Sequence, residues 1–404
     1  MGAYLDHAAT TPMRAEAVEA MLPFLTERFA NPSGAHRLAR DARRAIDEAR
    51  DELAALVGCA PGEIVFTSGG TEADNLAVFG ARAASPAAPA ASTAPLGLPV
   101  CSAVEHHAVL DPVLALGGRT AAVDRTGRLD LDDLEKVLAV EADRQGAGDG
   151  PGVRLVSVMP VNNETGALQP VADVARLVAR LAPGAVVHAD AVQALCTTAV
   201  HDTCAGADLL SFSAHKFGGP KGVGLLVVRE RAEVVARQLG GGQERGRRSG
   251  TQDVAGIVAM ATAARLAVAQ RDTEIARLTS LRDRLADGLL AAVPDIVETG
   301  VPVVDGRPDR SGRAPHVLHL CLADVESEAL LFLLERSEVY ASAASSCASG
   351  AMEPSHVLAA MDVDPVLAAG SLRLSLGWST TSAEIDHALE AIPPAVVQLR
   401  RFAI

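Results

Sequence analysis

The sequence predicts an α/β fold, a mostly parallel β-sheet covered by helices on both faces, with a smaller second domain. Short valine-rich runs alternate with helical patterns along the chain, which is the rhythm of βαβ units. Polar motifs follow several of these runs, at the carboxyl ends of strands, where parallel sheets bind ligands. The chain has 404 residues, which is too many for one simple core, so two domains are expected.

Several apolar runs read as buried strands. Continuous apolar residues, without polar alternation, are typical of a sheet that is covered on both faces. The runs are "EIVFTS" at 63–68, "LPVCSAV" at 98–104, "VRLVSVMPV" at 153–161, "AVVHAD" at 185–190 and "GVGLLVVR" at 222–229.

Apolar residues recur at helical spacing in segments 38–58 and 273–293. Gly58 can end the first of these helices. Segment 171–181 is a further helical pattern that lies between two strand runs. A long helix that begins near residue 262 is expected to bridge to the second domain.

These patterns divide the chain into two predicted domains. The large domain covers 15–262, and the small C-terminal domain combines 1–14 with 263–404. Three further segments read as surface loops because they are rich in proline, glycine or polar residues. These segments are 84–99, 143–152 and 305–315.

Composition limits the classes of function. The chain is 49% hydrophobic and 21% charged, an ordinary globular balance, and its net charge of −14 argues against nucleic-acid or anionic-membrane partners. No apolar run approaches the ~20 residues of a membrane span. The start of the chain shows no secretory signal, so we expect a cytoplasmic protein with reduced thiols. The six cysteines form no CxxC pair, so no metal site is predicted.

The use of lysine is selective. Of 36 basic residues only three are lysines, Lys136, Lys216 and Lys221, and two of these lie in "SFSAHKFGGPKG" at 211–222. Arginine supplies the same charge but does not lose its proton readily, so it is a poor amine nucleophile. Lys216 is therefore a candidate for imine formation with a cofactor aldehyde. Lys221 reads better as a solvated loop charge.

A phosphate cradle is one interpretation of "FTSGGTEADN" at 66–75. Gly69 and Gly70 permit a tight turn, Thr71 offers a hydroxyl, and the following helix presents free N–H groups. The alternative is a plain glycine turn before a capped helix. Ser213 and His215, beside the lysine, could also bind the phosphate.

Asp190, at the end of "HAD", could hold a protonated pyridine nitrogen, as pyridoxal phosphate requires. A metal pair with His188 is the alternative, but no third ligand is obvious, and we favour a buried, hydrogen-bonded role for that histidine. His106 in "EHHAVL" could stack on a cofactor ring, and Asn163 in "VNNETG" could donate to a phenolic oxygen.

Two C-terminal residues are candidates for substrate chemistry. Cys347 lies among serine, alanine and glycine, which predicts an exposed loop, and an exposed thiol is costly to keep unless it reacts. Arg373 lies between apolar residues and could clamp a carboxylate. The bland alternatives are a core cysteine and a structural ion pair.

Taken together and in order, these motifs resemble the pyridoxal-phosphate-dependent cysteine desulfurases of the class V aminotransferase family. The resemblance runs from "YLDHAATT" to "SLRLSLGWSTT". It implies the type I aminotransferase fold, with a mixed seven-stranded sheet in the large domain, a smaller C-terminal α+β domain and a homodimer. Gly218 stands where an aromatic residue is often found, and the 84–99 loop is longer than the family pattern.

The resemblance also implies the role of each site residue. Lys216 holds the cofactor, Asp190 pairs with the ring nitrogen, and His106 stacks over the ring. The phosphate is bound by Gly70, Thr71, Ser213 and His215, and by Thr251 from the neighbouring subunit. Gln193 and Asn163 address the ring oxygen, Asn31 and Arg373 clamp the substrate carboxylate, and Cys347 is the nucleophile.

The implied reaction converts L-cysteine to L-alanine and leaves the sulfur on Cys347 as a persulfide. The implied acceptor of this sulfur is an iron–sulfur scaffold or a tRNA-thiolation relay. A selenocysteine lyase or another class V enzyme is the alternative, although a transaminase has no use for a thiol in such a loop. The complete set of Lys216, Asp190, His106 and Cys347 argues against a non-catalytic scaffold.

Overall fold

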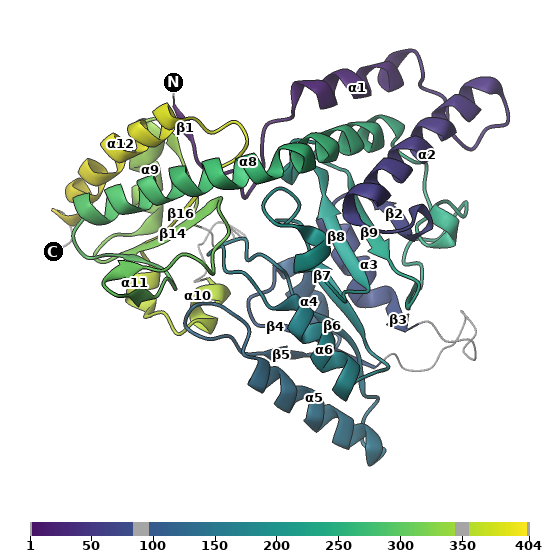
Figure 1. The fold of residues 1–404 in the computed structure, drawn as a ribbon, viewed down its shortest axis with the longest axis horizontal. Coiled ribbons are helices and arrows are strands. Elements are labelled where there is room, and N and C mark those ends of the chain that lie inside the picture. The colour runs from purple at the N-terminus through teal and green to yellow at the C-terminus, as the bar shows by residue number, and fades with distance from the viewer. Residues whose placement is uncertain (1, 84–96, 344–354, 402–404) are drawn as a thin grey trace.

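A computed structural model describes residues 2–83, 97–343 and 355–401. Its largest sheet has seven strands in the order β2-β9-β8-β7-β6-β4-β5 (Figure 1). Strand β9 pairs antiparallel with β2 and β8, and every other pairing is parallel. The predicted mixed, mostly parallel seven-stranded sheet is therefore confirmed. Its strands are β2 (Ile64–Thr67), β4 (Leu98–Ser102), β5 (Arg119–Ala121), β6 (Val153–Ser157), β7 (Val186–Asp190), β8 (Leu209–Ser213) and β9 (Gly224–Val228).

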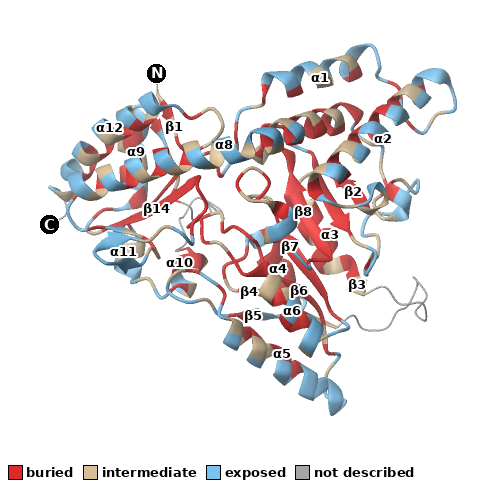
Figure 2. Cartoon of the chain, viewed as in Figure 1, coloured by how far each residue is buried: buried red, intermediate tan, exposed pale blue. Residues whose placement is uncertain are grey.

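Helices cover this sheet on both faces, and this explains the continuous apolar runs. Leu155, on β6, packs in one core with the inner face of α3 (Gly70–Gly80). Its neighbour Val156 faces a larger core shared with α2, α5, α6 and α8. Because successive side chains of a strand point to opposite faces, both must be apolar. Figure 2 shows the strands buried and the outer faces of the helices exposed.

The helices lie close to the segments predicted for them. α2 ends at Gly58, whose left-handed φ of 69° is accessible to glycine without strain. The helical segments are α1 (Ala15–Thr26), α2 (Arg37–Val57), α4 (His107–Ala115), α5 (Leu131–Gly146), α6 (Val171–Leu181), α7 (Val200–Thr203), α8 (Val254–Ala292), α9 (Ser327–Arg336), α10 (His356–Ala360), α11 (Pro365–Ala368) and α12 (Ser382–Arg400), with 3₁₀ turns at Pro61–Glu63, Ala214–Lys216 and Glu244–Gly246.

The bridging helix begins earlier than residue 262, so that prediction was wrong. α8 starts at Val254, where the carboxylate of Asp253 accepts a hydrogen bond from the N–H of Gly256. It then runs for 39 residues along both halves of the molecule (Figure 1). An 18-residue window of α8 is apolar enough for a membrane span, but 56% of that window is buried, as in a core helix.

A second core surrounds a three-stranded antiparallel sheet in the order β11-β14-β16, formed by Ile296–Glu298, Val317–Leu322 and Ser371–Ser375. The N-terminal strand β1 (Ala3–Tyr4) pairs with β15 (Val339–Tyr340), and Ala3 and Leu5 lie in this second core. Because α8 contributes to both cores, the domain limits 15–262, 1–14 and 263–404 stay predictions.

The three predicted loops have different outcomes. Most of the first, 84–96, lies outside the described residues. In the second, α5 continues to Gly146 before the chain turns. The third contains half of a small hairpin in which β12 (Val303–Val304) pairs with β13 (Arg307–Pro308). A further pair joins β3 (Ala81–Ala83) to β10 (Ala232–Val234) at the side of the large sheet.

Candidate active site

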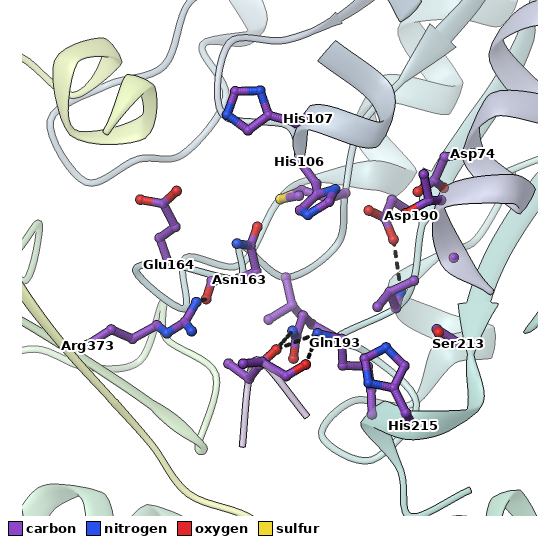
Figure 3. A pocket seen from close by; sticks show the side chains of 18 of the residues that line it. Asp74, His106, His107, Asn163, Glu164, Asp190, Gln193, Ser213, His215 and Arg373 are labelled. Atoms are coloured by element: carbon purple, nitrogen blue, oxygen red, sulfur yellow. Dashed lines mark hydrogen bonds between the residues drawn. The ribbon is translucent and has the colours of Figure 1, made fainter. Parts of the chain in front are cut away.

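A cavity of about 320 Å³ lies at the carboxyl ends of the parallel strands, and Figure 3 shows its walls. Parallel strands end at one edge, so polar residues that follow different strands meet there. The cavity is lined by ten residues that the sequence singled out, namely Gly70, Thr71, His106, Asn163, Asp190, Gln193, Ser213, His215, Lys216 and Arg373.

One end of the cavity has the form of a phosphate cradle. Thr71, Ser213 and His215 converge there beside the N-terminus of α3. A Cβ atom at Gly70 would lie 2.8 Å from Cγ2 of Val192, so the close approach of the backbone requires glycine. This packing requirement holds for either interpretation of the glycine motif, so the phosphate cradle stays a prediction.

The amine of Lys216 is held by backbone carbonyls at the edge of the cavity. Its Nζ donates hydrogen bonds to the carbonyl oxygens of Ala8 at 2.6 Å and Ala9 at 2.8 Å. Burial, together with the nearby Arg373, lowers the pKa of Lys216 to about 8, while Asp190 opposes this shift. About a tenth of the amine is therefore unprotonated at pH 7, far more than for a free lysine, and this is the state that can attack a carbonyl carbon.

Asp190 is the carboxylate at the end of β7, and it accepts a hydrogen bond from the N–H of Val192 at 3.1 Å. Burial raises its pKa, and His106 and Lys216 oppose that shift. A second buried carboxyl group, Asp74, lies close by (Figure 3), and burial and Asp190 raise its pKa well above the usual range. A cationic ring nitrogen would relieve the buried charge of Asp190.

His188 has the structural role that the sequence favoured. Its ring nitrogens are hydrogen-bonded to the hydroxyl groups of Ser157 at 2.8 Å and Ser211 at 2.9 Å. Burial lowers its pKa to about 3, so the ring is neutral. Within the described residues no group of three or more His, Cys, Asp or Glu side chains could hold a metal ion.

The adjacent asparagines of one motif separate into a structural and a cavity-facing member, whereas both His106 and His107 line the cavity. Asn162 is fully buried and its amide oxygen accepts hydrogen bonds from the backbone of Glu164 and Thr165, whereas Asn163 lines the cavity. His106 caps α4 by accepting a hydrogen bond from the N–H of Ala108 with Nδ1. Because Nδ1 accepts, the neutral ring carries its proton on Nε2, the only nitrogen free to donate.

Arg373 comes from β16 of the smaller sheet and reaches the same cavity (Figure 3). Its Nη2 donates to Oδ1 of Asp6 at 2.8 Å, and its Nη1 donates to the carbonyl oxygen of Asn163 at 3.0 Å. The guanidinium is buried, and its Nε has no hydrogen-bond partner among the described residues. A positive group with unused donor capacity can bind a substrate carboxylate.

Two predicted site residues are not in this cavity, and a third lies outside the described residues. Asn31 is exposed, and its side-chain oxygen accepts a hydrogen bond from the N–H of Ser33. Thr251 is also exposed, in a loop outside the cavity lining. Cys347 lies outside the described residues. The roles of all three stay predictions.

Sequence reasoning missed several cavity residues. Glu164 lines the cavity, accepts a hydrogen bond from the hydroxyl of Ser355 at 2.5 Å, and has its pKa raised by burial to about 7. It lies inside a motif that had been singled out for its asparagine. His356, at the start of α10, contacts the ring of His107 edge-on. Both contacts join segments that are far apart in the sequence, so the sequence does not indicate them. The one available signal was that Glu164 is an acidic residue inside a motif that also carries a site residue.

The described cysteines are free thiols, and none lines the main cavity. Burial raises the pKa of Cys59 to about 11 and those of Cys196 and Cys204 to about 12. Such thiols are rarely ionised and are poor nucleophiles. Of the six cysteines, Cys347 therefore keeps its place as the candidate nucleophile.

Comparison with known proteins gives one consistent result. The family model described as "Aminotransferase class-V" matches residues 3–388. "Cysteine desulfurase IscS" of Dictyoglomus turgidum is 40% identical over 402 residues, 98% of this chain and 95% of that protein. "IscS-like cysteine desulfurase" of Mycobacterium tuberculosis is 42% identical over 403 residues, 100% of this chain and 98% of that protein. A solved structure of a NifS-like protein is similar with a TM-score of 0.85 and 32% identity, covering 98% of this chain and 100% of that one.

Proposed function

Because this chain belongs to the class-V aminotransferase family, we propose that it is a cysteine desulfurase that uses pyridoxal 5'-phosphate to convert L-cysteine to L-alanine. The observation that carries the proposal is the placement of Lys216 and Asp190 on one cavity beside a phosphate cradle. An amine with a lowered pKa, a buried carboxylate and an anion site are the three groups that this cofactor needs.

The residues of the cavity fit pyridoxal phosphate. Gly70, Thr71, Ser213 and His215 would hold its phosphate, and Asp190 its ring nitrogen. Lys216 would bind it covalently through Nζ. When bound, the cofactor supplies an electron sink for the carbanion that forms at the substrate Cα atom.

The protein side chains then divide the remaining tasks. Arg373 would bind the carboxylate of L-cysteine and so orient the Cα–H bond, because its guanidinium reaches the cavity from the smaller sheet. Lys216 Nζ, once displaced by the substrate amine, would take the Cα proton. His106 would stack on the ring and hold a proton at Nε2 for transfer toward the substrate sulfur.

Cys347 would accept the sulfur. Its thiolate attacks the sulfur of L-cysteine, the Cβ–S bond breaks, and a proton completes the methyl group of alanine. The electron pair of the broken Cβ–S bond stays on Cβ of the substrate, which is reduced, while the new S–S bond makes the transferred sulfur the outer atom of a persulfide, so no external oxidant is needed. An exposed position of Cys347 would let the persulfide reach an acceptor protein.

Several finer features belong to the same proposal. We propose an iron–sulfur scaffold or a tRNA-thiolation relay as the acceptor, a homodimer in which Thr251 reaches the phosphate in the partner's cavity, and a cytoplasmic location. Asn31 would bind the substrate carboxylate together with Arg373. The exposure of Thr251 is consistent with a role toward a second copy. The free thiols of the described cysteines are consistent with a cytoplasmic location.

The decisive experiment combines cofactor uptake with a variant of the thiol. Purified protein should turn yellow with pyridoxal phosphate, consume L-cysteine and release alanine and reducible sulfur in equal amounts. Cys347→Ser should keep the colour and lose sulfide release, with Cys196→Ser as a control that keeps both. A colourless protein would refute the cofactor assignment, and undiminished sulfide release by Cys347→Ser would refute the nucleophile. Selenocysteine offered in place of cysteine tests the alternative substrate.

A further inference from the structure

We propose that His316 is a positioning residue that fixes the amide of Gln193, so that an N–H of Gln193 faces the ring oxygen of the bound cofactor. The inference rests on the proposed function, because it concerns the site of pyridoxal phosphate. The two side chains come from different halves of the molecule. Gln193 follows β7 of the large sheet, and His316 immediately precedes β14 of the smaller sheet.

The contacts form a short chain of hydrogen bonds. His316 Nε2 lies 3.2 Å from Oε1 of Gln193. Nε2 of Gln193 donates to the carbonyl oxygen of Ala8 at 2.9 Å. The same carbonyl accepts the hydrogen bond from Lys216 Nζ at 2.6 Å. His316 is therefore connected to the reactive amine through two intermediate groups.

Hydrogen-bond capacity fixes the direction of this chain. The carbonyl of Ala8 can only accept, so the nitrogen of the Gln193 amide must face it and the oxygen must face His316. His316 must then donate from Nε2. The Gln193 nitrogen carries a second N–H, and since Gln193 lines the cavity, this hydrogen is available to a phenolic oxygen there.

His316 is suited to this role because it stays neutral. It is only 6% exposed, and burial lowers its pKa to about 3. The charged or titratable groups nearest to it are Arg282, His7, Arg373 and Lys216, all of which oppose a further positive charge. A neutral imidazole has one N–H, and the contact with Gln193 uses it.

The other ring nitrogen of His316 does not compete for the proton. Nδ1 is buried and has no hydrogen-bond partner among the described residues. The contact with Oε1 of Gln193 is therefore the one described hydrogen bond that the ring makes, and it requires the proton on Nε2.

The test measures cofactor affinity, not turnover. Apoprotein is titrated with pyridoxal phosphate and the absorbance of the bound form is followed for the parent, His316→Leu, Gln193→Leu and the double variant. We expect His316→Leu to weaken binding about five- to tenfold, the size of one lost hydrogen bond. If His316 acts through Gln193, adding His316→Leu to Gln193→Leu should cost nothing further.

Two matched variants separate positioning from general structural damage. His316→Gln keeps a donor near the Nε2 position and should restore most of the affinity. His319→Leu removes another buried histidine, three residues further along the chain in β14, which bonds to Thr299 and does not line the cavity, and it should leave cofactor affinity unchanged. If His316→Leu does not fold, His316→Asn, whose amide is too short to reach Gln193, takes its place.

Each outcome decides the question. Parent-like affinity of His316→Leu, or a full additive loss in the double variant, would overturn the role of His316 while leaving the proposed function standing. A parent protein that takes up no cofactor would overturn the proposed function, and this inference with it. Loss of affinity that is rescued by glutamine and absent in the Gln193→Leu background would establish it.

Discussion

The two ends of the main cavity are built in different ways. At the cofactor end, Gly70, Asp190 and Ser213 line the cavity from the ends of strands of one sheet or from the start of the adjoining helix α3. Thr251, which we expect at the phosphate of a neighbouring subunit, is exposed outside the cavity lining. At the substrate end, Arg373 lines the cavity from β16, a strand of the second core, and Asn31 is exposed elsewhere. One sheet edge thus brings the cofactor end together, whereas the substrate end depends on a side chain from the other half of the molecule.

The largest effect on the cofactor end is expected when the amine of Lys216 is removed. Lys216→Ala should lower turnover by about 10⁴-fold or more, because covalent attachment and proton transfer at Cα are lost together. Turnover is measured as alanine formed, and the yellow form should be absent. Lys136→Ala serves as the control, since its side chain is exposed on α5 and does not line the cavity. A yellow Lys216→Ala protein would mean that another lysine binds the cofactor.

Loss of the guanidinium should weaken the substrate end alone. Arg373→Gln should raise the KM for L-cysteine about 100-fold, the cost of a charge-assisted contact to a carboxylate, while cofactor affinity changes little. Steady-state kinetics and a cofactor titration separate the two effects. If cofactor affinity fell as far as substrate affinity, the two ends would not be independent.

The pH dependence of cofactor uptake should report on the amine. Since the pKa of Lys216 is lowered to about 8, the unprotonated fraction rises with pH through that value, and uptake should be about tenfold faster at pH 9 than at pH 7. Stopped-flow absorbance measures the rate. In Arg373→Gln the midpoint should move upward, because a cation that lowers the pKa has been removed. A midpoint of ~10.4, the value of free lysine, would contradict the assignment.

Among these substitutions the smallest effect is expected at Thr251, and it tests whether a second copy of the chain contributes to the cofactor site. Thr251→Ala should weaken pyridoxal phosphate binding about tenfold, the loss of one hydroxyl hydrogen bond to the charged phosphate. Thr251→Ser should be nearly silent. The cofactor titration is repeated over a range of protein concentrations, because a partner's hydroxyl can act only in the associated state. An effect that persisted in a monomer would place Thr251 in its own chain's site.

Much of the cofactor end was predictable because its residues follow strands. Asp190 and Ser213 end neighbouring parallel strands, so sequence motifs far apart along the chain must converge at that edge. The carbonyls of Ala8 and Ala9 were not predictable as partners of Lys216, since backbone groups carry no signal in residue type. Nor was the pairing of Arg373 with Asp6, which joins positions 367 apart.

The start of α8 shows another limit of sequence reasoning. Asp253 is a favourable N-cap, but Gly256 lowers helix propensity within the first turn, so the pattern alone suggested a later start. Packing decides the outcome. A Cβ atom at position 256 would lie 2.4 Å from Cγ2 of Val223, so the glycine lets the helix approach the sheet. The residue that weakens the helix locally is the one that its tertiary position requires.

α8 also has a mechanical consequence. Its N-terminal part, through Ala267, packs in the first core, and from Leu278 onward it packs in the second. One continuous rod of 39 residues, about 58 Å long at 1.5 Å per residue, therefore fastens the two halves at a set spacing. A movement of the half that carries Arg373 relative to the half that carries Lys216 would bend α8 between Ala267 and Leu278, where none of its residues is buried in either core. Heating should melt both halves in a single step, because neither can release its share of the rod without fraying the other.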